Sequence, residues 1–347
     1  MSSFFLALCC CCSGKRNAYI FFNGQKLWVE KLLGEEGHSF LYLVRSSEGQ
    51  SFVLKKTKCP FGNLTAVAQA MREINCYKRF QSPHIAQLLD SQVIQESDGS
   101  KTVLLLLPYF PRGSLQDAVD GNLLEGTTMA QSDILRIGMG IARGLLCIHG
   151  EGEQQSQDEY SMAPTVYGEE HSLLNDHELD TFDSISQRYA HRDLKPSRIM
   201  ISSEGNPIIS DLGACSPAHI EFTSKQSVMQ FQDWRADNCT LGFTAPEILD
   251  VKQKSVITEK TDTWSFGCLL YMLCFGISPF EREEQVSGAS VTYAIATGKY
   301  SFPVATNCDS KLLALVQSCL TVDPASRPSM DSVLSQLSEL QGHSASS

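Results

Sequence analysis

The chain has 347 residues, and its 28 lysines and arginines against 39 aspartates and glutamates give it a formal net charge of −11. With 42% hydrophobic and 19% charged residues it has the composition of a folded globular protein, which excludes disorder throughout, and a core of this size needs no disulfide or metal. The acidic balance excludes a nucleic-acid-binding protein, because phosphate contacts need a basic surface.

The first 24 residues are expected to form a tail that attaches the chain to a membrane surface. An apolar stretch, residues 4–8, precedes four adjacent cysteines, and Lys15 and Arg16 follow. No basic residue precedes this stretch, which disfavours a secretory signal, and adjacent cysteines cannot wrap a zinc ion. A frayed terminus and S-acylation remain; acylation is favoured, because exposed thiols there are a liability unless modified and two acyl chains anchor stably. The acylation candidates are Cys9, Cys10, Cys11 and Cys12.

From about Gln25 the sequence predicts a small lobe of strands with one helix. Apolar and polar residues alternate through three segments, as in antiparallel strands with one buried face. The apolar positions are Leu27, Val29, Leu32, Phe40, Tyr42, Val44, Phe52 and Leu54. Residues 64–80 have helical spacing, and the apolar run 103–107 has the length of one buried strand, well short of the roughly 18 residues that span a bilayer.

Beyond Gly113 the pattern is mainly helical. Apolar residues recur at a period near 3.6 over residues 132–149, with Ser132 as the expected N-terminal cap. Residues 226–237 also have helix-forming spacing. Four further helices are predicted at 261–275, 291–296, 310–320 and 330–340. The acidic, low-complexity stretch 150–188 is expected to be a loosely ordered insertion, either a tolerated surface loop or a docking loop.

Two acidic residues in short motifs indicate phosphoryl transfer. The motif His191–Pro196 contains Asp193, and Asp211 follows eighteen residues later in Asp-Leu-Gly. One acid can receive a hydroxyl proton while the other holds a divalent cation on phosphate oxygens. Further motifs follow in order: Ala245-Pro246-Glu247, Asp262–Gly267 and finally Arg327. This ordered set resembles a eukaryotic protein kinase.

The resemblance covers residues 25–340 and implies an α+β, bilobal protein kinase fold. A small antiparallel-sheet lobe with one main helix (25–110) would precede a larger helical lobe (111–340), leaving a short polar tail at 341–347. ATP, Mg²⁺ (with Mn²⁺ as a possible substitute) and protein substrates are the implied ligands. Glu247 and Arg327 would form a buried structural pair.

The resemblance also implies roles for single residues. Asp193 would be the catalytic aspartate, braced by Thr240, and Asp211 would hold the metal. Lys195 would contact the transferred phosphate and indicates serine/threonine specificity. Lys55, oriented by Glu73, would bind the α and β phosphates. The nucleotide-binding set is completed by the glycine-loop residues Leu33, Gly34, Gly37 and Leu41, by Val53 and Met200 on either side of the base, by Leu107 as gatekeeper, and by Pro108 and Phe110 in the hinge.

Two residues depart from the family pattern. Glu36 stands where the second glycine of the phosphate loop is expected, and its carboxylate adds negative charge near phosphate unless it points to solvent. Arg198 replaces the asparagine that binds a second Mg²⁺, and a guanidinium has no acceptor atom for a metal, although it can meet a phosphate oxygen. These departures leave a second hypothesis open: a pseudokinase scaffold at a membrane.

The long segment between Asp211 and Glu247, with its helical spacing, resembles the Numb-associated kinases. The cysteine cluster and the stretches 33–35, 105–110 and 231–234 are similar to the acylated serine/threonine kinase 16 branch, whose fungal members are vacuole-membrane kinases. The implied location is the cytoplasmic face of an internal membrane, vacuole or Golgi, with a role in membrane trafficking. The nine cysteines outside the tail lie in apolar segments, as in a reduced compartment.

Overall fold

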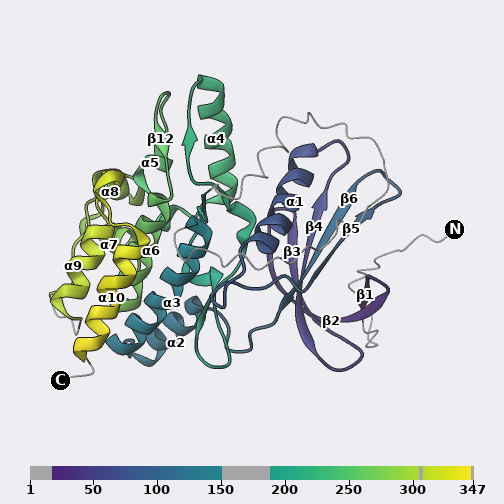
Figure 1. The fold of residues 1–347 in the computed structure, drawn as a ribbon, viewed down its shortest axis with the longest axis horizontal. Helices are drawn as coiled ribbons and strands as arrows, with labels where there is room; N and C mark the ends of the chain where they lie inside the picture. Colours follow the sequence, from purple (N-terminus) through teal and green to yellow (C-terminus); the bar gives the residue numbers. More distant parts are fainter. Residues whose placement is uncertain (1–17, 151–187, 305–307, 345–347) are drawn as a thin grey trace, which may run out of the picture.

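The structure is a computed structural model that describes residues 18–150, 188–304 and 308–344. The expected acylation sites Cys9–Cys12 and nearly all of the acidic stretch 150–188 lie outside these residues. Figure 1 shows two lobes, one built on a sheet and one built from helices, joined by the segment between residues 108 and 115. This is the α+β, bilobal arrangement that the sequence resemblance predicted.

The N-terminal lobe is a six-stranded antiparallel sheet in the order β1-β2-β3-β4-β6-β5, with one helix packed beside it. Its elements are β1 (Tyr19–Phe22), β2 (Gln25–Glu36), β3 (Ser39–Arg45), β4 (Ser51–Cys59), α1 (Leu64–Arg79), β5 (Asp90–Gln95) and β6 (Lys101–Pro108). Leu27, Val44 and Leu54 lie in a buried cluster on one face of the sheet. The alternation of apolar residues therefore predicted the buried face correctly.

The second lobe is mainly helical. Its helices are α2 (Leu115–Glu125), α3 (Gln131–His149), α4 (Lys225–Asn238), α5 (Pro246–Leu249), α6 (Lys260–Phe275), α7 (Pro279–Ser287), α8 (Val291–Thr297), α9 (Ser310–Cys319) and α10 (Met330–Ser344). The described loops of this lobe also form three two-stranded antiparallel sheets. They pair β7 (Tyr189–Ala190) with β10 (Ser216–Pro217), β8 (Ile199–Ile201) with β9 (Pro207–Ile209), and β11 (Ile220–Glu221) with β12 (Val256–Ile257). Short 3₁₀ turns are η2 (Pro196–Arg198), η3 (Leu212–Ala214), η4 (Leu241–Phe243) and η5 (Pro324–Ser326).

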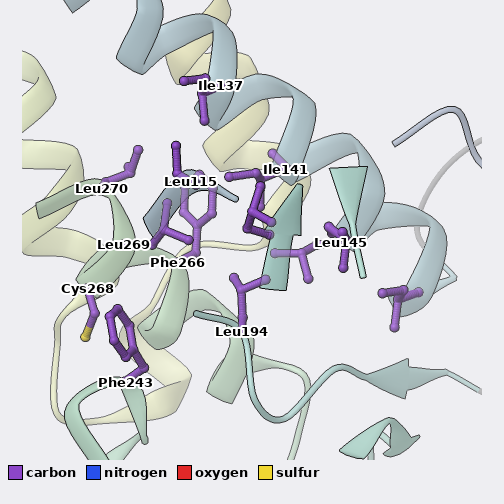
Figure 2. Close-up of a cluster of buried hydrophobic side chains, with 14 of the residues drawn as sticks. Leu115, Ile137, Ile141, Leu145, Leu194, Phe243, Phe266, Cys268, Leu269 and Leu270 are labelled. Carbon is purple, nitrogen blue, oxygen red and sulfur yellow. The ribbon is translucent and has the colours of Figure 1, made fainter. Parts of the chain in front are cut away.

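Helix α6 is the centre of the large lobe and is buried along nearly its whole length. Figure 2 shows Leu269 and Leu270 of α6 beside Ile137 and Ile141 of α3, with Leu194 among them. Leu194 directly follows Asp193, so the core fixes the backbone of the loop that carries this aspartate. In the described part of the chain no single helix has the length and hydropathy of a membrane span, although α6 and α7, bent by 64°, reach them together.

The sheet and one helix cap differ from the sequence expectations. The sheet begins with β1, before residue 25, because Tyr19–Phe22 pairs antiparallel with the first part of β2. The N-terminal cap of α3 is Ala130, which makes no side-chain bond, and Ser132 lies inside the helix. The helix therefore starts without the expected hydroxyl cap; Gln131 at its start donates no cap but accepts a hydrogen bond from the Asp309 backbone N–H at 2.6 Å.

Candidate active site

Asp262, in the first turn of α6, holds the loop that carries Asp193. Its carboxylate accepts hydrogen bonds from the backbone N–H groups of His191 (2.7 Å) and Arg192 (2.9 Å), and it pairs with Nε2 of His149 at 2.9 Å. Burial alone raises the pKa of Asp262, but the bond from His149 and the nearby positive charges outweigh it and lower that pKa. The buried carboxylate is therefore ionised, and it fixes the start of the loop.

Arg192 ties the same loop to the segment that follows Asp211. It has a left-handed φ of 68°, and its buried guanidinium donates to the carbonyl oxygens of Pro217 (2.8 Å) and Ala218 (2.6 Å). A buried guanidinium without partners would cost free energy. Because its partners here are carbonyl oxygens of the segment after η3, the same bonds also fix that segment. The sequence singled out Arg192 only as part of a motif, and its partners are distant in the chain.

Asp193 lies at the end of a short polar chain. Its Oδ1 accepts a hydrogen bond from the backbone N–H of Thr240 at 2.8 Å, and Nζ of Lys195 lies 3.5 Å from its Oδ2. The same Nζ donates to Oγ1 of Thr240 at 2.8 Å. The structure thus brings together Asp193, Lys195 and Thr240, as the sequence predicted, with a carboxylate placed to accept a proton and an ammonium beside it.

The lysine, glutamate and second aspartate of the prediction meet across the two lobes. Nζ of Lys55, on β4, lies 2.7 Å from Oε1 of Glu73, on α1, and 2.7 Å from Oδ1 of Asp211. Burial lowers the pKa of Lys55, but the carboxylates of Asp211 and Glu73 outweigh it and raise that pKa, so the ammonium stays charged. The hydroxyl of Tyr77 accepts from the Asp211 backbone N–H at 2.9 Å, which holds this residue in its left-handed conformation.

A cavity of about 510 Å³ opens between the lobes beside these charges. Apolar side chains and hinge backbone line one end, and Lys55, Lys195 and Asp211 line the other. The predicted residues that line it are Leu33, Leu41, Val53, Leu107, Pro108, Phe110 and Met200. Its size, apolar walls and few convergent polar groups are typical of a small-molecule or cofactor site.

Two predicted glycine-loop residues lie elsewhere. Gly37 lines a second cavity of about 500 Å³ between the loop, α1 and α4, and Gly34 lies in β2 opposite Leu41 of β3. Sequence reasoning missed other residues of the first cavity, among them Lys31 and Ser114. No motif marks these two positions, because they line the cavity only through the fold.

The two departures from the family pattern contact each other. Nη2 of Arg198 lies 3.2 Å from Oε1 of Glu36, and Nε of Arg198 lies 2.8 Å from Oδ2 of Asp211. A third nitrogen, Nη1, pairs with Oδ2 of Asp193. The sequence alone does not predict this contact, because Glu36 and Arg198 are 162 positions apart.

The residues fit one divalent cation better than two. Asp211 offers hard carboxylate oxygens at the polar end of the cavity, and Mg²⁺ is usually bound by one or two carboxylates together with substrate phosphates. Among the described residues no group of three or more histidine, cysteine or acidic side chains could hold a metal alone. A second ion does not fit beside Arg198, because its guanidinium is all donors and positively charged.

Comparison with known proteins agrees with this geometry. Residues 185–337 match the model of the protein kinase domain. The chain is 44% identical to serine/threonine-protein kinase ENV7 of Saccharomyces cerevisiae over 94% of this chain and 95% of that protein. It is 32% identical to serine/threonine-protein kinase ppk13 of Schizosaccharomyces pombe (92% of each) and 33% identical to serine/threonine-protein kinase 16 of Mus musculus (96% and 95%). Motifs, fold and relatives agree, and the chain belongs to the protein kinase family, in the branch of serine/threonine-protein kinase 16.

Proposed function

We propose that the chain is a serine/threonine protein kinase that transfers the γ-phosphate of ATP to hydroxyl groups of protein substrates. The observation that carries this proposal is the meeting of Asp193, Lys195 and Thr240 with Lys55 and Asp211 at the polar end of one cavity. A site that moves a phosphoryl group needs a proton acceptor, cations for the phosphates and a cleft for the base, and this cavity offers all three.

Each side chain has a role in the transfer. The substrate hydroxyl oxygen bonds to the γ-phosphorus, the bond from that phosphorus to the oxygen bridging to the β-phosphate breaks, and Asp193 receives the hydroxyl proton. Lys195 neutralises charge on the moving phosphoryl group, while Lys55 binds the phosphates that stay on ADP. Asp211 would hold Mg²⁺, which when bound would supply further charge neutralisation. The apolar end of the cavity holds the adenine.

Serine/threonine specificity is supported by Lys195 and by the relatives. The hydrogen bond from Lys195 to Thr240 places an ammonium and a hydroxyl group beside Asp193, where a small hydroxyl-bearing side chain would approach. Several relatives, over nearly their full length, are named serine/threonine-protein kinases.

The test is transfer of labelled γ-phosphate to a generic basic protein, followed by identification of the phosphorylated amino acid. We expect phosphoserine and phosphothreonine, and we expect Asp193→Asn to lower the rate by about 10²- to 10⁴-fold, the range that general base catalysis contributes. Phosphotyrosine as the main product would contradict the specificity. Equal rates for wild type and Asp193→Asn would contradict the role of Asp193.

We further propose that S-acylation of Cys9–Cys12 tethers the kinase to the cytoplasmic face of an internal membrane, vacuole or Golgi, where it acts in membrane trafficking. The support is the sequence pattern: an apolar stretch, four adjacent thiols and then Lys15 and Arg16, which can meet anionic headgroups. Several acyl chains together give stable anchoring, whereas one chain binds only marginally.

Replacing all four tail cysteines by serine tests the tether. We expect the protein to move from the membrane pellet to the supernatant of a cell lysate while phosphate transfer by the purified protein is unchanged, because the tail is far from the site in sequence. Cys147→Ser with Cys308→Ser is the matched control, since both thiols lie outside the tail and are partly exposed. A tail variant that stays in the pellet would show that acylation is not the anchor.

A further inference from the structure

Arg198 is a nearly buried cation with three carboxylate partners. Its side chain is 9% exposed, and its Nε, Nη1 and Nη2 atoms face Asp211, Asp193 and Glu36 in turn. The backbone is fixed as well, since its carbonyl oxygen accepts hydrogen bonds from the backbone N–H and the hydroxyl of Ser210. The guanidinium is therefore held between the two aspartates of the site.

This position excludes a second divalent ion. The guanidinium carries five donors, no acceptor and a permanent charge, so it repels a cation and cannot ligate one. It uses the outer oxygens of both aspartates, Oδ2 of Asp193 and Oδ2 of Asp211. Oδ1 of Asp211 faces Lys55, on the other side of the carboxylate. Both Asp211 oxygens therefore already face a cation, and a single metal ion would share this carboxylate and take its other ligands from the nucleotide phosphates.

Glu36 is the exchangeable partner of Arg198. Its side chain is 57% exposed, against 2% for Asp193 and 23% for Asp211, and it comes from the end of β2 beside the turn to β3. Glu36 also lines both cavities that flank the charged cluster. A phosphate group pairs with a guanidinium at least as well as a carboxylate does, so a nucleotide phosphate can take the place of Glu36.

The charges of the cluster agree with such an exchange. Three cations, Lys55, Lys195 and Arg198, face four carboxylates, of which only Glu36 is largely exposed. When Glu36 turns away, three cations and three carboxylates remain, so the cluster itself is neutral and the side of the guanidinium that Glu36 occupied is open to a phosphate oxygen. A divalent ion at Asp211 would then add positive charge for the triphosphate, with Arg198 in the place of a second ion.

We infer that Arg198 is the resident second cation of this kinase, that the enzyme works with a single divalent ion at Asp211, and that Glu36 occupies Arg198 until a nucleotide triphosphate displaces it. The inference rests on the proposed phosphoryl transfer, and it names the cation that the transfer uses. It assigns a joint role to the two residues that depart from the family pattern.

The number of bound Mn²⁺ ions tests the inference without a catalytic readout. The full chain is titrated with Mn²⁺ and a non-hydrolysable β,γ-imido analogue of ATP, and electron paramagnetic resonance counts the ions; two Mn²⁺ ions about 4 Å apart in one site are spin-coupled. We expect one uncoupled Mn²⁺ in wild type and in Arg198→Lys, which keeps the cation. We expect two coupled ions in the double variant Glu36→Gly with Arg198→Asn.

Nucleotide affinity tests the exchange at Glu36. Glu36→Gln removes a competitor for Arg198, so the imido analogue with Mg²⁺ should bind roughly two- to fivefold tighter, the range that a partly exposed ion pair is worth. Glu35→Gln is the matched control, because it removes the same charge from the adjacent position, whose carboxylate lies near Tyr42. That variant should change the affinity by less than about 1.5-fold.

Each outcome separates the inference from the proposed function. Two Mn²⁺ ions in wild type, or none, would overturn the single-metal arrangement even if the enzyme transfers phosphate. Equal affinities for wild type and Glu36→Gln would overturn the exchange. One Mn²⁺ in wild type, two in the double variant and no phosphate transfer would instead contradict the proposed function and leave the metal arrangement standing. Thermal unfolding of each variant shows that it is folded.

Discussion

His191 is a fully buried histidine. Its backbone N–H donates to the Asp262 carboxylate, and its ring Nδ1 accepts a hydrogen bond from the Asp193 backbone N–H. Its ring lies in the core of the catalytic loop, and burial, with the charge of Arg198, lowers its pKa below the usual 6.5 although the surrounding carboxylates raise it. The neutral ring is therefore the form that fits the fold. Because the unfolded chain binds a proton near pH 6.5 and the folded chain does so only at lower pH, acid favours unfolding.

The lowered pKa of His191 predicts that the free energy of unfolding depends on pH. As the pH falls below about 6.5, the free energy of unfolding should fall by up to about 1.4 kcal/mol per pH unit from this group, until the folded pKa is reached. His191→Gln should flatten that slope, measured as urea unfolding between pH 5 and 7.5. The exposed His219 is the control, and His219→Gln should change the slope less than His191→Gln does. An identical slope in His191→Gln would refute the role of His191, and the half-buried His84, whose pKa burial also lowers, would then be the next group to replace.

Contiguous motifs were predictable residue by residue, and contacts between distant residues were not. Asp193, Lys195 and Asp211 stand in short motifs, so their positions near one another followed from the sequence. The contact between Glu36 and Arg198 joins positions 162 apart, and no local pattern encodes it. In the sequence each of the two is a separate departure from the family pattern, whereas in the structure they form one charge pair.

At the scale of elements, long periodic segments were predictable and short or polar ones were not. Helix α3 and strands β2 to β4 have clear apolar periods, and the structure confirms them. Strand β5 (Asp90–Gln95) is largely polar, and β1 is four residues long, so both gain their structure from pairing with a neighbour. The predicted N-terminal cap of α3 was wrong. The helix begins at Gln131, so Ser132 is its second residue and cannot stand at the cap position.

Asp262, in the first turn of α6, holds the loop that contains Asp193, so we expect its replacement to lower the free energy of unfolding. Asp262→Asn keeps the shape but replaces one acceptor oxygen by a donor, leaving a buried N–H of the loop unsatisfied. We expect a loss of about 2 to 3 kcal/mol in the free energy of unfolding by urea. Asp133→Asn is the control at the exposed start of α3 and should cost less than about 0.5 kcal/mol. A loss in Asp262→Asn as small as in the control would contradict the role of α6.

At the scale of the whole molecule, the site exists only where the lobes meet. Lys55 comes from the sheet of the small lobe and Asp211 from the large lobe, 156 positions later, yet their charged atoms lie 2.7 Å apart. The hydrogen bond from Gln69 of α1 to Asn238 of α4, at 2.6 Å, also links the lobes, outside the charged cluster. The position of α1 therefore depends on the long segment after Asp211. This coupling could not be read from the sequence, because it depends on how the lobes pack.

The rate of phosphate transfer from ATP by Lys55→Met tests most directly whether this junction of the lobes is a phosphoryl-transfer site. The Lys55 ammonium pairs with Glu73 in the small lobe and with Asp211 in the large lobe. Its loss should lower the rate about 10²- to 10³-fold, as for other groups that stabilise charge in a transition state. The protein should stay folded. We expect measurable transfer by wild type and that loss in Lys55→Met. No transfer by wild type at saturating ATP with Mg²⁺ or Mn²⁺, or equal transfer by both proteins, would contradict it.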